Sequence, residues 1–158
     1  GDHRDLHTAY RRQRQMCIRD RMKVIIIYGS ANDKEFMKPA HTFFDENGVK
    51  YEDHVISAHR NLPELIQFLR DLNDSGEKAV ILAVAGLAAA LPGVVAVETE
   101  LPCVGVPVPG GPLKGIDALL AMSQVPGGVP VGCVGIHSKA PLNAAMYAYR
   151  ILKFAGLE

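Results

Sequence analysis

Closely spaced cysteines are missing from this sequence of 158 residues. Cys17, Cys103 and Cys133 lie far apart and form no CxxC pair, which indicates a reducing compartment, and we expect a cytoplasmic protein. One of these thiols could be a nucleophile, but cysteines within apolar strands usually serve packing, and we favour that role. No set of His, Asp, Glu and Cys has metal-ligand spacing, so we expect no metal.

A surplus of charge of one sign is missing as well, because the sequence has 17 basic and 17 acidic residues. Six arginines fall within residues 1–21, and the part after position 21 holds 11 basic and 14 acidic residues. This mildly acidic part has no basic stripe, which argues against nucleic acid as a partner.

The sequence also lacks a long hydrophobic run without interruption. Residues 79–97 carry no charge and approach the length of a membrane span, but Gly86, Pro92 and Gly93 interrupt them. A buried strand, a turn and a helix explain this segment better, so we expect no membrane span. Residues 1–21 contain no apolar signal-peptide core, and we expect them to be a non-native or disordered leader outside the fold.

Strand and helix patterns alternate after position 21. Runs of apolar and β-branched residues predict strands at residues 23–28, 49–56, 79–85, 102–107 and 131–136. Apolar residues at helical spacing follow the strands, in residues 36–44, 62–72, 88–97, 115–123 and 141–154. Five such units predict a single α/β domain over residues 22–158, a three-layer α/β/α sandwich around a mainly parallel five-stranded sheet.

The first strand-to-helix turn, residues 29–33, combines features of a ligand site. Gly29 lets a ligand approach the backbone, Ser30 offers a hydroxyl, and a helix start favours an anion. The turn has neither the dinucleotide-binding glycine pattern nor a P-loop lysine, so NAD and ATP are not supported. Ser30 or Asp33 could equally cap the helix, and the pattern leaves both roles open.

The second turn, residues 57–60, reads Ser-Ala-His-Arg and precedes a helix for which Asn61 is the expected N-cap. A histidine moves protons near neutral pH, and an arginine binds phosphate. His59 could instead be an ordinary half-buried histidine, and Arg60 could form a weak surface pair with Glu64. Because ligands bind at the carboxyl ends of parallel strands, we favour a functional site here.

The third turn, residues 83–93, has almost no polar side chains. We expect its backbone to approach a flat ligand closely, although close helix packing would explain the same composition. Two further loops, residues 107–115 and 126–130, are rich in glycine and proline and could close over a pocket or contact a neighbouring subunit.

The histidines outside the second turn are weaker candidates. His137 follows the fifth predicted strand at the ligand-binding edge, whereas His41 and His54 fall within a helix and a strand and are expected to be structural or solvated. No nucleophile elbow of the Gly-x-Ser-x-Gly type occurs.

Over residues 22–154, the chain resembles the PurE family. One motif alone would be weak evidence, but seven in the family's order make a specific match. They are Gly29-Ser30-Ala31-Asn32-Asp33, Ser57-Ala58-His59-Arg60, Ala85-Gly86-Leu87-Ala88-Ala89-Ala90-Leu91-Pro92-Gly93, Gly105-Val106-Pro107-Val108, Gly115-Ile116-Asp117-Ala118-Leu119-Leu120, Gln124-Val125-Pro126-Gly127-Gly128-Val129-Pro130-Val131 and Asn143-Ala144-Ala145.

The resemblance implies a flavodoxin-like fold, an octamer, and a step of purine biosynthesis that uses no metal or organic cofactor. A carboxylate moves from the exocyclic nitrogen N5 to ring carbon C4 of an aminoimidazole ribonucleotide. The resemblance assigns proton transfer to His59 as general acid and base. It also implies that Ser30 and Arg60 bind the 5′-phosphate, that Asp33 binds the ribose hydroxyls, and that Ser57 supports the pocket.

Within the third turn, the resemblance implies three further residues at the substrate, namely Ala85, Gly86 and Leu91. This turn also departs from the family pattern. Val84 and Leu87 stand where most bacterial mutases have glycine, and Ala90 stands where they have histidine. In addition, residues 137–139 replace the usual Gly-Lys-Ala.

Two other functions remain open at this point. One is the related aminoimidazole ribonucleotide carboxylase, which uses CO2 directly, although residues 88–93 resemble the mutase branch. The other is a non-catalytic ribonucleotide-binding relative, which the polar group missing at Ala90 would suit.

Overall fold

The computed structural model describes residues 22–156, so the predicted leader and Cys17 lie outside the described residues. Five parallel strands form one sheet in the order β2-β1-β3-β4-β5. The strands are β1 (Met22–Tyr28), β2 (Tyr51–Val55), β3 (Lys78–Ala85), β4 (Cys103–Pro107) and β5 (Gly132–Cys133). The predicted parallel sheet is therefore confirmed, and its strands all end at the same edge.

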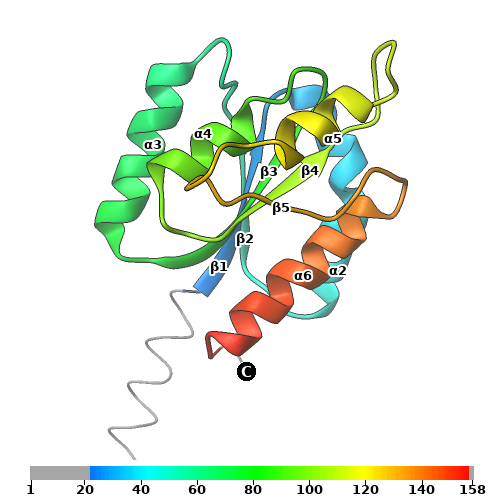
Figure 1. The fold of residues 1–158 in the computed structure, drawn as a ribbon. Helices are drawn as coiled ribbons and strands as arrows, with labels where there is room; N and C mark the ends of the chain where they lie inside the picture. Colours follow the sequence, from blue (N-terminus) through cyan, green and yellow to red (C-terminus); the bar gives the residue numbers. More distant parts are fainter. Residues whose placement is uncertain (1–21, 157–158) are drawn as a thin grey trace, which may run out of the picture.

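Helices cover both faces of this sheet. They are the 3-10 helix η1 (Ala31–Met37), α2 (Lys38–Glu46), α3 (Leu62–Ser75), α4 (Leu91–Glu98), α5 (Ile116–Ser123) and α6 (Ala140–Phe154). Helices α2 and α6 lie on one face, and α3, α4 and α5 lie on the other (Figure 1). The fold is the predicted flavodoxin-like α/β/α sandwich.

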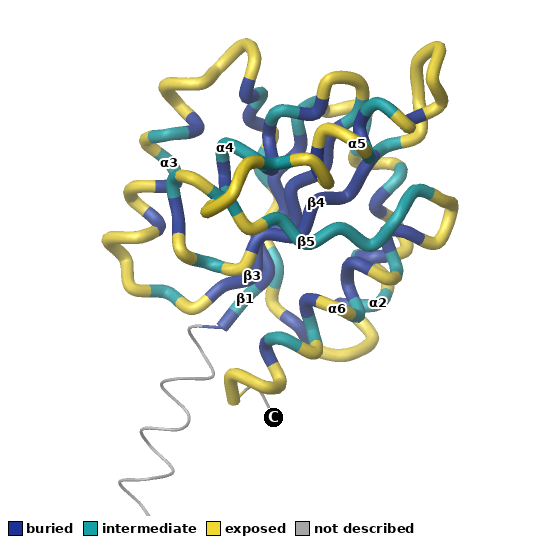
Figure 2. Tube along the Cα trace, viewed as in Figure 1, coloured by how far each residue is buried: buried dark blue, intermediate teal, exposed yellow. Residues whose placement is uncertain are grey.

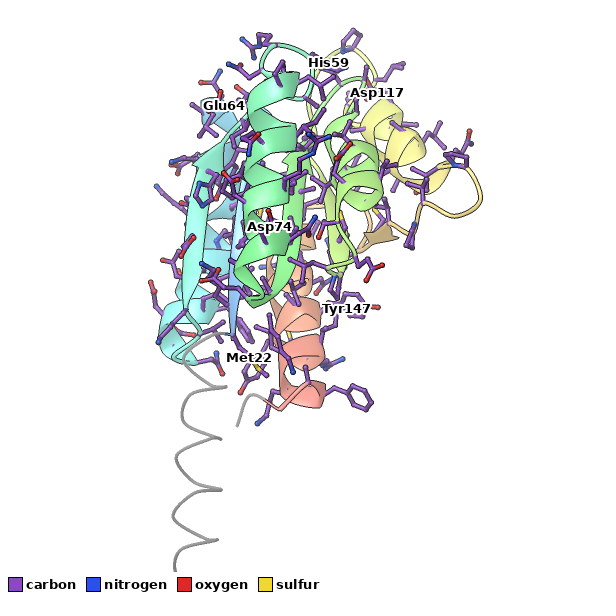
Figure 3. All side chains as sticks on the ribbon, turned by 90° about the vertical axis from the view of Figure 1, so that its left-hand side faces the viewer. Met22, His59, Glu64, Asp74, Asp117 and Tyr147 are labelled. Carbon is purple, nitrogen blue, oxygen red and sulfur yellow. The ribbon has the colours of Figure 1, made fainter. Side chains whose placement is uncertain are left out.

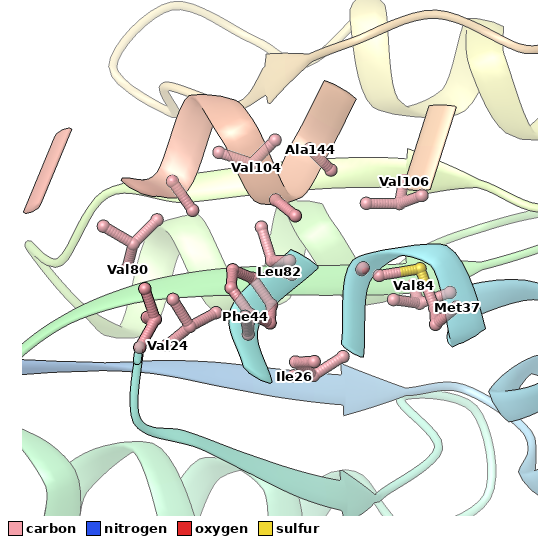
Figure 4. Close-up of a cluster of buried hydrophobic side chains, with 14 of the residues drawn as sticks. Val24, Ile26, Met37, Phe44, Val80, Leu82, Val84, Val104, Val106 and Ala144 are labelled. Carbon is pink, nitrogen blue, oxygen red and sulfur yellow. The ribbon is translucent and has the colours of Figure 1, made fainter. Parts of the chain in front are cut away.

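The core consists of two apolar clusters, one on each face of the sheet. They lie around β1, β3 and β4, which are buried along most of their length, whereas the edge strands β2 and β5 contain no buried residue (Figure 2). Alternate side chains of a strand point to opposite faces, so Val24 and Ile26 pack toward α2 and α6, and Ile25 and Ile27 pack toward α3 and α4. In the first cluster, Phe44 lies over the sheet (Figure 4). These packed layers hold the strand ends in fixed positions.

The helix predicted after the first turn is split into two segments. A 3-10 helix, η1, comes first, and α2 then begins with Pro39 in its first turn. Proline is tolerated there because the first-turn N–H groups have no partner within the helix. Helix α2 ends at Glu46, and Asn47 is its C-cap, followed by Gly48 at φ +63°, a typical arrangement at a helix end.

Several predicted elements are shorter in the structure, among them β2, which spans Tyr51–Val55 instead of residues 49–56. Helix α4 begins at Leu91 rather than at residue 88, because residues 87 and 88 form a turn in which Leu87 adopts φ +53°. Strand β5 spans two residues instead of 131–136. Pro130 lacks an N–H just before it, and Gly135 leaves the extended conformation at φ +90°.

Residues 79–97, which approach the length of a membrane span, are divided between β3, a turn and α4. None of the helices within residues 22–156 is long and apolar enough to cross a membrane.

Candidate active site

The three predicted turns meet at the carboxyl edge of the sheet and line one cavity of about 570 Å³. Its wall includes all the residues for which the family resemblance implies a role at the site, namely Ser30, Asp33, Ser57, His59, Arg60, Ala85, Gly86 and Leu91. Figure 3 places His59 at the opposite end of the molecule from Met22, the first residue of β1. The cavity volume is in the range that small-molecule ligands occupy.

The first turn supplies a helix cap that also faces the cavity. The Ser30 hydroxyl accepts a hydrogen bond from the Asn32 amide at 3.4 Å, and the Asp33 amide donates to the Ser30 carbonyl at 3.1 Å. Burial raises the pKa of Asp33 above its ordinary value, and a hydrogen bond from the Ser30 backbone partly offsets that rise. Ser30 and Asp33 therefore serve the turn and remain available at the cavity wall.

The second turn is closed by its own serine. Ser57 accepts hydrogen bonds from the Arg60 amide on its Oγ at 3.3 Å and from the Asn61 amide on its carbonyl at 2.8 Å. Ala58 is buried, whereas His59 and Arg60 are exposed and line the cavity. This tight turn directs the two chemically active side chains outward from a fixed backbone.

The structure does not bear out two interpretations of this turn, the capping role of Asn61 and the surface pair of Arg60 with Glu64. Asn61 occupies the N-cap position of α3, but its side chain makes no capping hydrogen bond, since its backbone conformation (φ −130°, ψ 39°) differs from that of a typical cap. Within residues 22–156, the structure records no ion pair of Arg60 with Glu64 or another carboxylate. The surface-pair interpretation of Arg60 is thus not supported.

The third turn forms an apolar wall. Hydrogen bonds join it to its neighbours, from the Gly29 amide to the Val84 carbonyl at 2.9 Å and from the Val108 amide to the Ala85 carbonyl at 3.0 Å. Leu91 is buried at the start of α4, and the half-buried Ala90 contributes only a methyl group. This part of the site offers backbone groups and apolar surface, as its composition predicts.

The loop after β4 also contributes to the cavity. Val108, Gly110 and Gly111 line it, and a Cβ atom on Gly111 would lie 2.6 Å from Cδ2 of Leu87. The structure thus shows loop 107–115 at the pocket, which is one of the two roles that its sequence left open. The loop that contains residues 126–130 supplies none of the described cavity residues.

Sequence reasoning assigned no role to Asn32, which lines the cavity beside Asp33. The position of Asn32 within the first turn, between Ser30 and Asp33, is the feature of the sequence that could have indicated its place in the cavity wall. His137, the weaker candidate, is absent from the described cavity wall; it is exposed, and its Nδ1 accepts a hydrogen bond from the Lys139 amide at 3.1 Å.

Of the described cysteines, Cys103 is a core residue. Burial raises the pKa of its thiol to about 12, and the thiol lies 3.7 Å from the Pro92 carbonyl. A thiol that stays protonated at neutral pH is a poor nucleophile, so the packing role is confirmed for Cys103. Among residues 22–156, no group of three or more His, Cys, Asp and Glu side chains could hold a metal ion.

Comparison with known proteins gives consistent matches over most of the chain. A family model described as AIR carboxylase matches residues 23–157. N5-carboxyaminoimidazole ribonucleotide mutase of Saccharolobus solfataricus is 45% identical over 130 residues, which cover 82% of this chain and 80% of that protein. The protein of the same name from Bacillus subtilis is 45% identical over 127 residues, with coverages of 80% and 78%.

The fold has similar solved structures as well. The crystal structure of Treponema denticola PurE matches with a TM-score of 0.77 at 25% sequence identity, and the match covers 85% of this chain and 82% of that one. The sequence and structure matches both extend across the three turns that line the cavity.

Proposed function

The chain belongs to the AIR carboxylase family, and we propose that it moves a carboxylate from N5 to C4 of an aminoimidazole ribonucleotide, as an N5-carboxyaminoimidazole ribonucleotide mutase. The observation that carries this proposal is the common cavity of the three turns, which brings His59, Arg60 and Asp33 together. Relatives at 45% identity are named for the mutase reaction.

Recognition of the ribonucleotide is assigned to the first two turns. Of the described residues that line the cavity, Arg60 alone carries a permanent positive charge, which suits a 5′-phosphate. The Ser30 hydroxyl adds a hydrogen bond to the phosphate, and the Asp33 carboxylate accepts hydrogen bonds from the ribose hydroxyls. Ser57 holds the second turn through its bonds to the backbone of residues 60 and 61.

Chemistry is assigned to His59, which serves two proton transfers in sequence. In the first step the N5–carboxyl bond breaks, CO2 leaves, and the electron pair that remains on nitrogen takes a proton from His59. In the second step C4 attacks CO2, a carbon–carbon bond forms, and the C4 proton passes to His59. The histidine is thereby returned to its starting state, so one group is sufficient for both steps.

The apolar third turn suits the intermediate stage of this reaction. The segment from Leu87 to Leu91 presents methyl and isobutyl groups to the cavity, and released CO2 is itself uncharged. A wall that offers CO2 no polar partner and excludes water would keep it beside C4 until the new bond forms.

A coupled assay tests the proposal. Conversion of the N5-carboxylated ribonucleotide without added bicarbonate is the expected result. Turnover of the uncarboxylated ribonucleotide at high bicarbonate only would indicate the direct carboxylase instead. Ribonucleotide binding without turnover of either compound would indicate a non-catalytic relative.

We further propose that the protein is a cytoplasmic homo-octamer, as the family resemblance implies. Large apolar side chains are exposed on α5 and the loop before it, namely Leu113, Ile116 and Leu120. Exposed apolar side chains that cluster on one helix are suited to contact another subunit.

A further inference from the structure

Tyr28, His41 and Asp53 form a cluster of polar side chains next to Gly29, a residue of the cavity wall, and the proposed reaction does not use them. The Tyr28 hydroxyl lies 3.0 Å from Asp53 Oδ1 and 3.1 Å from His41 Nε2, and His41 Nε2 lies 3.1 Å from Asp53 Oδ1. The three residues come from β1, α2 and β2. The cluster therefore joins three elements through one buried hydroxyl.

The hydrogen bonds of this cluster have a defined direction. A carboxylate only accepts, and the Tyr28 hydroxyl donates to Asp53, so His41 must carry its proton on Nε2 to bond with the same carboxylate. The imidazole ring is stacked on Tyr51, with 5.1 Å between ring centroids and 13° between planes. The Tyr28 hydroxyl is thus held by partners that are themselves fixed.

The backbone of Tyr28 and Gly29 connects all three turns of the site. The Tyr28 carbonyl accepts a hydrogen bond from the Ile56 amide at 3.0 Å, directly before Ser57. The adjacent Gly29 amide donates to the Val84 carbonyl at 2.9 Å, directly before Ala85. A rotation or shift of Tyr28 would therefore move the ends of β2 and β3 together with the turn that follows β1.

The ring of Tyr28 also contacts the segment that carries Asp33. Lys34 Nζ lies 5.7 Å from the centroid of this ring, and Lys34 is the neighbour of Asp33 in η1. Tyr28 is fully buried, so its ring alone would satisfy packing, whereas burial of a hydroxyl is favourable only when it is hydrogen-bonded. The hydroxyl therefore contributes directional hydrogen bonds, which fix the orientation of Tyr28, rather than apolar contact.

We propose that Tyr28 is a positioning residue for ribonucleotide binding, and that its hydroxyl, held by Asp53 and His41, sets the relative positions of the phosphate-binding and ribose-binding turns. The role rests on the function proposed above. It requires that loss of the hydroxyl weakens binding of the ribonucleotide and leaves the proton transfers of His59 intact.

The first test compares Tyr28→Phe with Tyr51→Phe. Both changes remove one hydroxyl and keep the ring, and the Tyr51 hydroxyl bonds to Asp45, outside the cluster. In Tyr28→Phe, Asp53 and His41 keep their mutual hydrogen bond, so the variant is expected to fold. We expect KM, and the Kd for the uncarboxylated ribonucleotide measured by calorimetry, to rise roughly 3- to 10-fold with kcat unchanged. Tyr51→Phe should match the wild type in all three.

The second test asks whether the effect passes through Asp53. Asp53→Ala should raise KM as much as Tyr28→Phe does, the double variant should add nothing, and Asp53→Asn, whose amide oxygen still accepts, should restore KM toward the wild-type value. Equal KM values for Tyr28→Phe and the wild type, an equal rise in Tyr51→Phe, or a fall in kcat alone would overturn the role of Tyr28.

These measurements also distinguish failure of the proposed mutase function from failure of the role proposed for Tyr28. Wild-type protein that binds the ribonucleotide but does not turn it over would refute the mutase reaction, while the Kd series would still decide the role of Tyr28. Wild-type protein that binds no ribonucleotide at all would refute both.

Discussion

Single residues at the cavity divide into those held by the backbone and those left free to act. Ser57 is occupied by hydrogen bonds within its own turn, whereas His59 and Arg60 extend from that turn into the cavity. Ser57 therefore maintains the conformation of the turn, whereas His59 is available to react. Substitutions at the two positions should have different consequences.

His59→Asn is expected to abolish turnover while ribonucleotide binding persists. Loss of a general acid and base lowers the rate by roughly 100-fold or more, and asparagine retains polarity and approximate size at this exposed position. The measurements are the coupled assay for turnover and calorimetry for binding, with Arg60→Gln as the matched control that should weaken binding. An active His59→Asn variant would refute the role given to this histidine.

Asp33→Asn is expected to stabilise the fold at neutral pH and to weaken ribonucleotide binding. Burial raises the folded-state pKa of Asp33 above its ordinary value of 3.8, so ionisation costs stability once the pH exceeds that value. Below it the carboxyl is protonated in folded and unfolded chains alike, and the cost disappears.

Thermal unfolding at a series of pH values checks this expectation. The Tm of Asp33→Asn should exceed that of the wild type at pH 7, and the difference should narrow as the pH falls toward 4. A difference that stays constant over this range would show that ionisation of Asp33 is not its cause.

At the scale of elements, the start of α5 depends on one glycine. Gly115 has φ +87°, and a Cβ atom there would lie 2.9 Å from both the Val108 carbonyl oxygen and the Pro109 Cα. Gly115→Ala should therefore destabilise the protein by at least about 2 kcal/mol, because the left-handed conformation and a backbone clash add together. Urea unfolding measures the loss.

Gly127→Ala provides the matched control. No atom lies within 4 Å of the Cβ position at Gly127, and its φ is outside the left-handed region. Its free energy of unfolding should stay within about 0.5 kcal/mol of the wild-type value. Similar losses for the two variants would mean that the geometry at Gly115 is not the cause.

The sequence was sufficient to predict the elements that carry the site. Lys23 to Tyr28 is a β-branched run that only a buried strand explains, and the turn motifs directly follow strand patterns, so their meeting at one edge was predictable from parallel topology. The length of β5 was not predictable from local pattern, since a strand at the edge of the sheet depends on its single neighbour, β4.

The cluster of Tyr28, His41 and Asp53 could not be predicted from the sequence either, because it also depends on how neighbouring strands pair. His41 was predicted to be structural or solvated, and no motif links it to Tyr28 or Asp53. Strand register brings the residues together. Ile26 pairs with Asp53, and Ile26 and Tyr28 lie on the same face of β1, so the Asp53 carboxylate lies on the face that carries Tyr28. Register is a property of the paired strands rather than of either segment.

At the scale of the whole molecule, the proposed octamer would use the exposed apolar side chains of α5. Ile116 and Leu120 are 55% and 48% exposed and lie one helical turn apart, and Leu113 precedes them at 58%. We expect the wild type to sediment at about eight times the mass of one chain, 17.1 kDa. Leu120→Lys should shift it to smaller species, because a charge cannot be buried unpaired in an apolar interface.

Phe154→Lys is the control for this measurement. Phe154 is 97% exposed and is the last residue of α6. This end of α6 lies away from α5 (Figure 1), so replacement of Phe154 should leave the sedimentation unchanged. A monomeric wild type, or a Leu120→Lys variant that sediments like the wild type, would contradict the assignment of α5 to a subunit contact.

The cavity draws its wall from four separate stretches, the last of which reaches Gly111. During synthesis His59 and Arg60 emerge from the ribosome well before β3, the central strand of the sheet, which pairs with β1. A polypeptide that ends after Arg60 but before Gly111 would contain the histidine and the arginine but would lack a complete cavity in which to bind a ligand. Premature termination or proteolytic cleavage before position 111 should thus yield inert fragments rather than weakly active ones.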